Sequence, residues 1–313
     1  CGEMSPAELA SRVLTLNYFH RITPDDYRVL LHHLIQTDHI QLTEKGGLIV
    51  GLAGERVINS FKFYGVFQES EEYTVRSESQ ELGTVVAPPP PGEKIALAGH
   101  VWRVLEVDRK RHLIYCEMVK GKVPAYFGEC PGDLHTKVLK RMRQVLREDT
   151  LYPYLMKNAV SRLTQARCTA TQSGAADENL IFLGGKMWCF IPWLGTYGFL
   201  AMERFLRLKC GDKLGLKNLD PFRPFFMQFT MEADAPTFYA VLREEGEKLN
   251  NPMDLVYPNE VPLFDKYDEY LPEELVKKGF AYGVLRMDEV KDFCRSLSAE
   301  KARPAELVDG APS

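Results

Sequence analysis

The sequence predicts an α+β fold built as a winged helix, then a small β-barrel-like module, then a mixed α/β domain. Three observations predict it. Two capped helices and two short apolar runs open the chain, a series of alternating apolar runs fills residues 59–130, and strand-like and helix-like segments alternate over 131–295. With 313 residues, of which 45% are hydrophobic, the chain is long enough for two or three domains with substantial cores.

Residues 1–58 predict the winged-helix domain. Ser5 and Thr23 are each followed by proline, a combination typical of helix starts, and we expect the first helix to reach about Tyr18. Short strands on either side of a glycine turn then follow the helices, at residues 40–42 and 48–50. Winged helices bind proteins as well as DNA, so this domain does not distinguish a protein-binding function from a DNA-binding function.

Residues 59–130 predict the β-rich, barrel-like module. Short, nearly evenly spaced strands favour a small barrel or curled sheet. We expect these strands at residues 63–68, 73–75, 83–86, 94–97, 101–107 and 112–116. The proline run at 88–91 must be a loop or an edge connection, because proline cannot donate to a sheet.

The third domain, residues 131–295, opens with two basic helices. In the first, we expect one inward stripe of apolar residues, made of Leu134, Val138, Met142, Val145 and Leu146. Lys140, Arg143 and Arg147 then share the opposite face, with Lys137 and Arg141 at its flanks. In the second helix the expected inward residues are Leu155, Ala159, Leu163 and Ala166. The basic face indicates either an ordinary solvated surface or a phosphate-binding surface.

The rest of this domain alternates strands and helices. We expect a hairpin of strands at 180–183 and 187–192, and a strand at 225–229. Helices are expected at 199–208, 236–248, 272–278 and 288–297. The polar tail, residues 296–313, is expected to be disordered.

Charge is distributed unevenly along a chain whose net charge is −4. Residues 94–147 hold 12 Lys and Arg against 5 Asp and Glu, whereas residues 232–313 hold 10 against 18. Such asymmetry can concentrate a polyanion on one region. Single strands need cations for phosphates and flat faces for bases. The candidate nucleic-acid-binding residues are therefore Trp102, Arg103, Arg109, Lys110, Arg111, Lys137, Lys140, Arg143 and Arg147. For Trp102, burial in a strand is the alternative.

Motifs for catalysis are missing from the sequence. It holds no phosphate loop, no acidic Mg²⁺-holding box, no nucleophile elbow and no H-E-x-x-H. The seven cysteines form no C-x-x-C pair, which favours reduced thiols over disulfides or zinc. We therefore expect no catalytic or metal-binding residues and no enzyme activity from this chain alone.

The ends and the hydropathy of the chain indicate its setting. It begins with Cys1 rather than Met, which suggests processing or a fragment, and no secretory signal is present. No apolar run approaches the roughly 18 residues of a membrane span. We expect no membrane partner and a cytoplasmic location.

Five stretches resemble the region that follows the two motor domains of DEAD/DEAH-box helicases of the large helicase-related (Lhr) type, including the DEAD/H-associated domain. They occur in the family's order and cover nearly the whole chain. These stretches are residues 51–55 with 63–67, 82–85 with 97–104, 127–129 with the basic helix after them, 192–196, and 266–275.

The resemblance implies that this chain is the C-terminal portion of an ATP-dependent superfamily 2 helicase. It would guide single-stranded DNA or RNA, help to separate DNA or RNA–DNA duplexes, and serve DNA repair. ATP and Mg²⁺ would be bound by the missing motor domains of the same polypeptide. Two alternatives stay open: a protein-interaction adaptor that docks partners through the winged helix and the acidic C-terminal half, and a nuclease.

Overall fold

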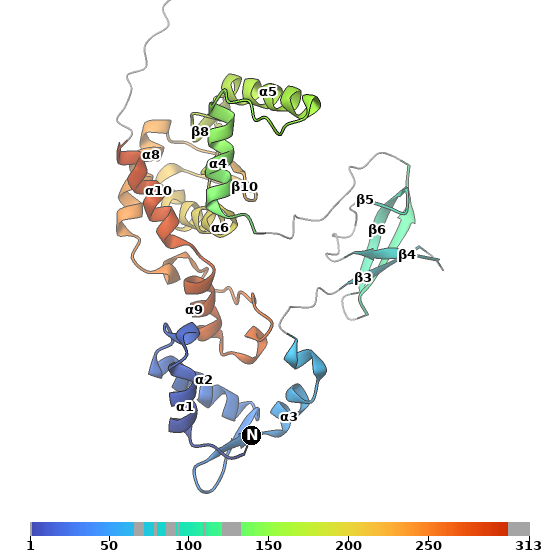
Figure 1. Ribbon diagram of the computed structural model, residues 1–313, viewed down its shortest axis with the longest axis vertical. Helices are drawn as coiled ribbons and strands as arrows, with labels where there is room; N and C mark the ends of the chain where they lie inside the picture. Colours follow the sequence, from blue (N-terminus) through green and yellow to red (C-terminus); the bar gives the residue numbers. More distant parts are fainter. Residues whose placement is uncertain are drawn as a thin grey trace, which may run out of the picture. The chain divides into compact units, whose positions relative to one another are not determined.

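The computed structural model shows an α+β protein (Figure 1). It describes residues 2–65, 72–77, 80–85, 92, 94–108, 111–120 and 133–299. The chain divides into two compact units, one made of Cys1–Ile49 with Asp133–Ser313 and the other of Val50–Gly132. The finer division at residues 58 and 130 stays a prediction.

The first unit opens with two helices and a hairpin. Its elements are α1 (Pro6–Leu14), a short helix η1 (Asn17–Phe19), α2 (Pro24–Gln36), β1 (Ile40–Leu42) and β2 (Leu48–Val50). Ser5 and Thr23 cap the two α-helices as expected, because each side chain accepts a backbone N–H three residues on. Helix α1 stops at Leu14, short of Tyr18. The element order matches the expectation, while the winged-helix assignment itself stays a prediction.

These N-terminal helices are bonded to the C-terminal part of the same unit. The Asp26 carboxylate accepts from the backbone N–H and the hydroxyl of Thr23, which closes a capping box. The same carboxylate lies 2.7 Å from the Lys278 ammonium on α9 (Glu273–Gly283). The Arg21 guanidinium also donates to the Tyr282 carbonyl, at 3.3 Å. One helix cap therefore also joins two segments that are far apart in sequence.

Residues 133–299 form a helical layer with a four-stranded antiparallel sheet in the order β10–β11–β9–β8. The strands are β8 (Leu180–Gly184), β9 (Met187–Phe190), β10 (Lys217–Phe222) and β11 (Phe226–Thr230). The sequence analysis missed β10. It contains Asp220 and Pro221, which disfavour strands, but it lies at the sheet edge, where proline is tolerated.

Helices α4 (Thr136–Arg147) and α5 (Lys157–Gln172) precede this sheet. Helix α6 (Thr196–Phe205) continues into a π-helical turn, η3 (Leu206–Cys210), and α7 (Gly211–Leu214). The remaining elements are α8 (Ala235–Lys248), η4 (Pro252–Leu255), η5 (Asp268–Tyr270), α9 and α10 (Met287–Ala299). Because α10 extends to Ala299, the start of the expected disordered tail is helical, and residues 300–313 lie outside the described ones.

The core of this part lies between the sheet and helices α6, α8 and α10. Phe190, Phe199 and Phe238 are fully buried there. Helices α8 and α10 approach so closely that a Cβ at Gly246 would lie 2.6 Å from the Cβ of Cys294. Only glycine at position 246 permits this spacing.

The second unit is a curled five-stranded sheet preceded by α3 (Leu52–Ile58) and η2 (Phe61–Tyr64). Its strands are β3 (Tyr73–Ser77), β4 (Gln80–Val85), β5 (Lys94–Leu97), β6 (His100–Asp108) and β7 (Leu113–Met118), in the order β4–β3–β7–β6–β5. Strands β3 and β7 are parallel and the other pairs antiparallel. Between the described parts of β4 and β5 there is no pairing, so the sheet curls without closing there. The Leu97 side chain nevertheless reaches within 3.6 Å of a Cβ placed on Gly83.

One expected strand of this unit is wrong. The alternation over residues 63–68 predicted β-structure, but its described beginning belongs to the short helix η2. The Ser60 hydroxyl accepts the Lys62 backbone N–H and starts this helical turn, a local hydrogen bond that alternation of side chains does not reveal.

Candidate nucleic-acid interface

Trp102 is a core residue, which corrects its assignment as a stacking face. It is 4% exposed and packs with Tyr73, Val75 and Ile114. Its indole N–H donates to the Leu97 carbonyl at 2.9 Å, so its polar atom is satisfied inside the module. With its ring faces covered, Trp102 is not available to a base in this structure.

The candidate cations of the same module lie beside carboxylates. The Arg103 guanidinium lies 3.4 Å from Glu117, its cross-strand partner on β7. Arg111 is 3.9 Å from Asp108 and also donates its backbone N–H to that side chain. Arg109 and Lys110 lie outside the described residues. Arg103 and Arg111, the two described candidates of this module, therefore have their charge partly offset.

The remaining four candidates lie together on α4, whose N-terminus is firmly held. The Leu134 carbonyl accepts the Thr196 N–H at 2.9 Å, and the Thr136 hydroxyl accepts the Gly195 N–H at 2.8 Å. Thr136 in turn donates to Glu289 on α10. A Cβ at Gly195 would lie 2.2 Å from the Leu134 carbonyl oxygen, so glycine is needed for this contact.

Arg143 and Arg147 anchor α4 to the segment after α5, and this corrects their assignment as free phosphate ligands. Both donate through Nε to the Ala176 carbonyl, at 2.9 and 2.8 Å. Arg143 also donates to the Asp177 carbonyl at 2.7 Å, and Arg147 lies 3.1 Å from the Asp177 carboxylate. These two arginines, which we call the anchoring pair, satisfy backbone carbonyls that no helix or strand bonds.

The expected inward stripe of α4 is also wrong in phase. Val138 and Met142 are exposed, whereas Thr136 and Leu139 are buried and Arg143 is half-buried. Neighbouring helical residues point about 100° apart, so a stripe assigned one residue off moves to a different side of the helix. The sequence analysis placed both arginines of the anchoring pair on the polar face because they are charged, although they bond to the segment after α5.

Lys137 and Lys140 remain accessible on α4, beside the anchoring pair. Both are exposed, and among the described residues neither forms an ion pair. Beside them, Arg141 donates to Gln144 at 3.3 Å and to Glu148 at 3.0 Å. We call this surface of Lys137, Lys140, Arg141 and Gln144 the open face of α4. It carries surplus positive charge and could meet phosphates.

The open face ends at two stacked tyrosines that the sequence analysis missed. Arg141 donates to the Tyr152 hydroxyl at 3.0 Å, and the rings of Tyr152 and Tyr154 lie 5.5 Å apart at 24°. Tyr154 is 78% exposed. The Tyr-Pro-Tyr run between two basic helices was the signal that could have found it.

Hydrogen bonding fixes Tyr152 and leaves Tyr154 open. The Tyr152 hydroxyl donates to Glu148, and together with Arg141 this bond lowers the pKa of the Glu148 carboxyl. The same bond to Glu148 raises the pKa of Tyr152. Tyr152 is therefore neutral and is held in place by these hydrogen bonds. Tyr154 stacks on its ring. A base placed on the free face of Tyr154 would extend that stack.

Among the described residues, no group of three or more His, Cys, Asp and Glu side chains is placed to hold a metal ion. On α5, Lys157 and Arg162 add two exposed cations close in sequence to Tyr154. This surface therefore presents exposed positive charge beside one exposed aromatic ring.

In the part of the chain that is described, no helix is long and apolar enough to cross a membrane. No family model, no curated protein and no solved structure matches the chain.

Proposed function

We propose that this chain binds single-stranded nucleic acid along the open face of α4, as the C-terminal portion of an ATP-dependent superfamily 2 helicase. The observation that carries the binding proposal is the row of Lys137 and Lys140 leading to the exposed ring of Tyr154. Phosphates would approach the lysines and a base would stack on the tyrosine.

The helicase part of the proposal rests on the resemblance of five stretches to the Lhr type. Motor domains of the same polypeptide would bind ATP and Mg²⁺ and drive the strand. This chain would guide single-stranded DNA or RNA and help to separate DNA or RNA–DNA duplexes, in DNA repair. Its own role is contact and guidance, without catalysis and without a membrane partner, in the cytoplasm.

Strand binding is tested with the full chain and a fluorescent oligothymidine at two salt concentrations. Replacing Lys137 and Lys140 with glutamine should weaken binding about tenfold at low salt. It should also reduce the slope of log affinity against log salt by about 1.4, at about 0.7 per lost phosphate contact. Unchanged affinity and slope in this variant, with the wild type binding, would remove α4 from the strand path.

A protein-docking adaptor is the second candidate, and one observation favours it. Beside the basic helices, Leu151 and Met156 are exposed together with Val138. Exposed apolar side chains near one another are typical of protein contacts. Binding by such a surface would change little with salt, so the same titration separates the two functions.

A further inference from the structure

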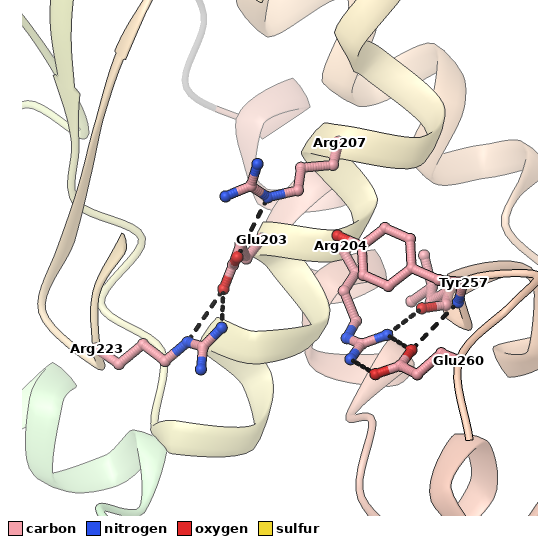
Figure 2. A network of polar contacts seen from close by, with 7 residues as sticks. Glu203, Arg204, Arg207, Arg223, Tyr257 and Glu260 are labelled. Atoms are coloured by element: carbon pink, nitrogen blue, oxygen red, sulfur yellow. Dashed lines mark hydrogen bonds and ion pairs between the residues drawn. The ribbon is translucent and has the colours of Figure 1, made fainter. Parts of the chain in front are cut away.

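A second group of arginines lies on helix α6, on the π-helical turn η3 that continues it, and in the turn that follows β10. Glu203 on α6 is 7% exposed and lies between two guanidinium groups (Figure 2). Arg207 donates to one carboxylate oxygen at 3.2 Å, and Arg223 donates twice to the other, at 3.1 and 2.7 Å. One buried carboxylate therefore holds two cations, which leaves one positive charge in excess.

One guanidinium group would be enough to neutralise the buried Glu203 carboxylate. The neighbouring pair shows the economical arrangement: Arg204 is buried, bonds Glu260 twice at 2.6 Å, and lies between the rings of Tyr257 and Phe280. There one carboxylate offsets one guanidinium. At Glu203 a single arginine would do the same, and the second would be dispensable for neutralising the buried charge.

Both arginines keep a group available to solvent. The side chains of Arg207 and Arg223 are 36% and 46% exposed. Arg207 uses Nε and Nη2, the latter donating to the Leu219 carbonyl at 2.7 Å, and Arg223 uses Nε and Nη2. Within the described residues, the Nη1 of each has no protein partner. Two held guanidinium groups with free N–H donors suit an oxyanion.

Arg207 and Arg223 both lie in irregular parts of the backbone, one in a π-helical turn and the other in a tight turn. Arg207 belongs to the π-helical turn η3, and such turns are rare and frequent at functional sites. Arg223 sits in the tight turn between β10 and β11. Two different elements thus present their arginines to the same carboxylate.

Exposed aromatic rings flank Arg223 in this turn. Phe222 stacks on Phe226 across the two strands, with ring centroids 4.7 Å apart at 20°. Phe222 and Phe225 are both about half-exposed, outside the filled core of this unit. Flat apolar faces beside free guanidinium groups are the combination that binds bases and phosphates together.

We infer that the β10–β11 turn is a second nucleic-acid subsite, which takes a backbone phosphate on the free Nη1 group of Arg223 and a base on Phe222. It rests on the proposed strand binding and extends it to a surface that sequence analysis did not single out. It needs no metal and no covalent step.

The test uses the full chain and the same oligothymidine titration. Arg223→Gln keeps Glu203 paired with Arg207, so the chain should fold while affinity falls about threefold to tenfold and the salt slope falls by about 0.7. Phe222→Leu should weaken binding about fivefold, and Phe222→Tyr, which keeps the ring, should bind like the wild type. Arg243→Gln, an exposed arginine on α8, is the matched control and should change neither quantity.

The outcomes separate this subsite from the open face. If the Lys137/Lys140 variant loses affinity and the turn variants do not, the subsite is refuted and the proposed function stands. If only the turn variants lose affinity, the subsite stands and the α4 path falls. A lower melting temperature in Arg223→Gln with unchanged affinity per folded molecule would show a purely structural triad. Displacement of the strand by polyglutamate at equal charge concentration would refute recognition of bases.

Discussion

Helix α4 carries two pairs of cations with different roles. Arg143 and Arg147 bond the Ala176 and Asp177 carbonyls and hold α4 to the segment after α5. Lys137 and Lys140 are exposed and, among the described residues, form no ion pair. Positive charge at helical spacing therefore does not define a binding surface. What separates the two pairs is whether backbone carbonyls from elsewhere in the chain already use the donors.

The anchoring pair should show the largest effect on stability. Replacing Arg143 and Arg147 with glutamine should lower the free energy of unfolding by about 3 kcal/mol, because several charge-assisted bonds are lost and partly buried carbonyls stay unpaired. The Lys137/Lys140 variant should stay within about 0.5 kcal/mol per site. Urea unfolding of both variants measures this. Equal loss of stability in the two variants would show that the anchoring pair and the two lysines do not differ in structural role.

The aromatic residues extend the comparison. Trp102→Leu should lower the free energy of unfolding by about 2 kcal/mol, because a buried ring and its bond to Leu97 are lost, with strand affinity unchanged per folded molecule. Tyr154→Leu should keep stability and weaken strand binding about fivefold. Thermal melts and oligothymidine titration on both variants test the pair. A Trp102 variant that folds normally yet binds weakly would restore the stacking role expected from the sequence.

Asp26 offers a pH test of an anchoring contact. Burial opposes ionisation of its carboxyl, but hydrogen bonds from Lys278 and Thr23 outweigh it and lower the pKa below its usual 3.8. Since the folded pKa is the lower one, its stabilising contribution is complete above about pH 4 and is lost as pH falls through the folded value. Asp26→Asn should lower stability by about 1 kcal/mol at neutral pH and reduce the acid dependence.

The control for this experiment is Asp25→Asn on the same helix. Asp25 is largely exposed and, among the described residues, its ion pair is with Arg28, so its loss should leave the acid dependence of unfolding nearly unchanged. Chemical unfolding between pH 3 and pH 7 follows both variants. An Asp26 variant with the wild-type acid dependence would show that the contact with Lys278 contributes nothing in solution.

The smallest effect is expected at Arg103. Its contact with Glu117 is half-exposed and 3.4 Å long, so Arg103→Gln should change the free energy of unfolding by less than about 0.5 kcal/mol. Strand affinity should also change less than in the Lys137/Lys140 variant, because Glu117 already offsets the charge. A larger loss of affinity in the Arg103→Gln variant would show that the β-rich module contributes to strand binding.

Local signals were enough for much of the secondary structure. Ser5 and Thr23 cap helices as their positions indicate, because a cap needs only residues three positions apart. Apolar runs located the strands of the curled sheet and the β8–β9 hairpin. The α+β class, apolar strand runs and basic character of α4 were therefore determined by sequence alone.

Only the tertiary structure decided which of these residues are free to act. Arg143 meets a carbonyl 33 residues away in sequence, and Arg223 meets a carboxylate 20 residues away. Neither partner lies near its arginine in sequence. Helical spacing therefore could not show whether an arginine bonds to its own chain or is free to bind a phosphate. The same holds for Trp102 and Tyr154, whose exposure depends on how complete elements pack. Side-chain type and spacing determine the local fold, while distant packing determines which charges and rings remain available to a partner.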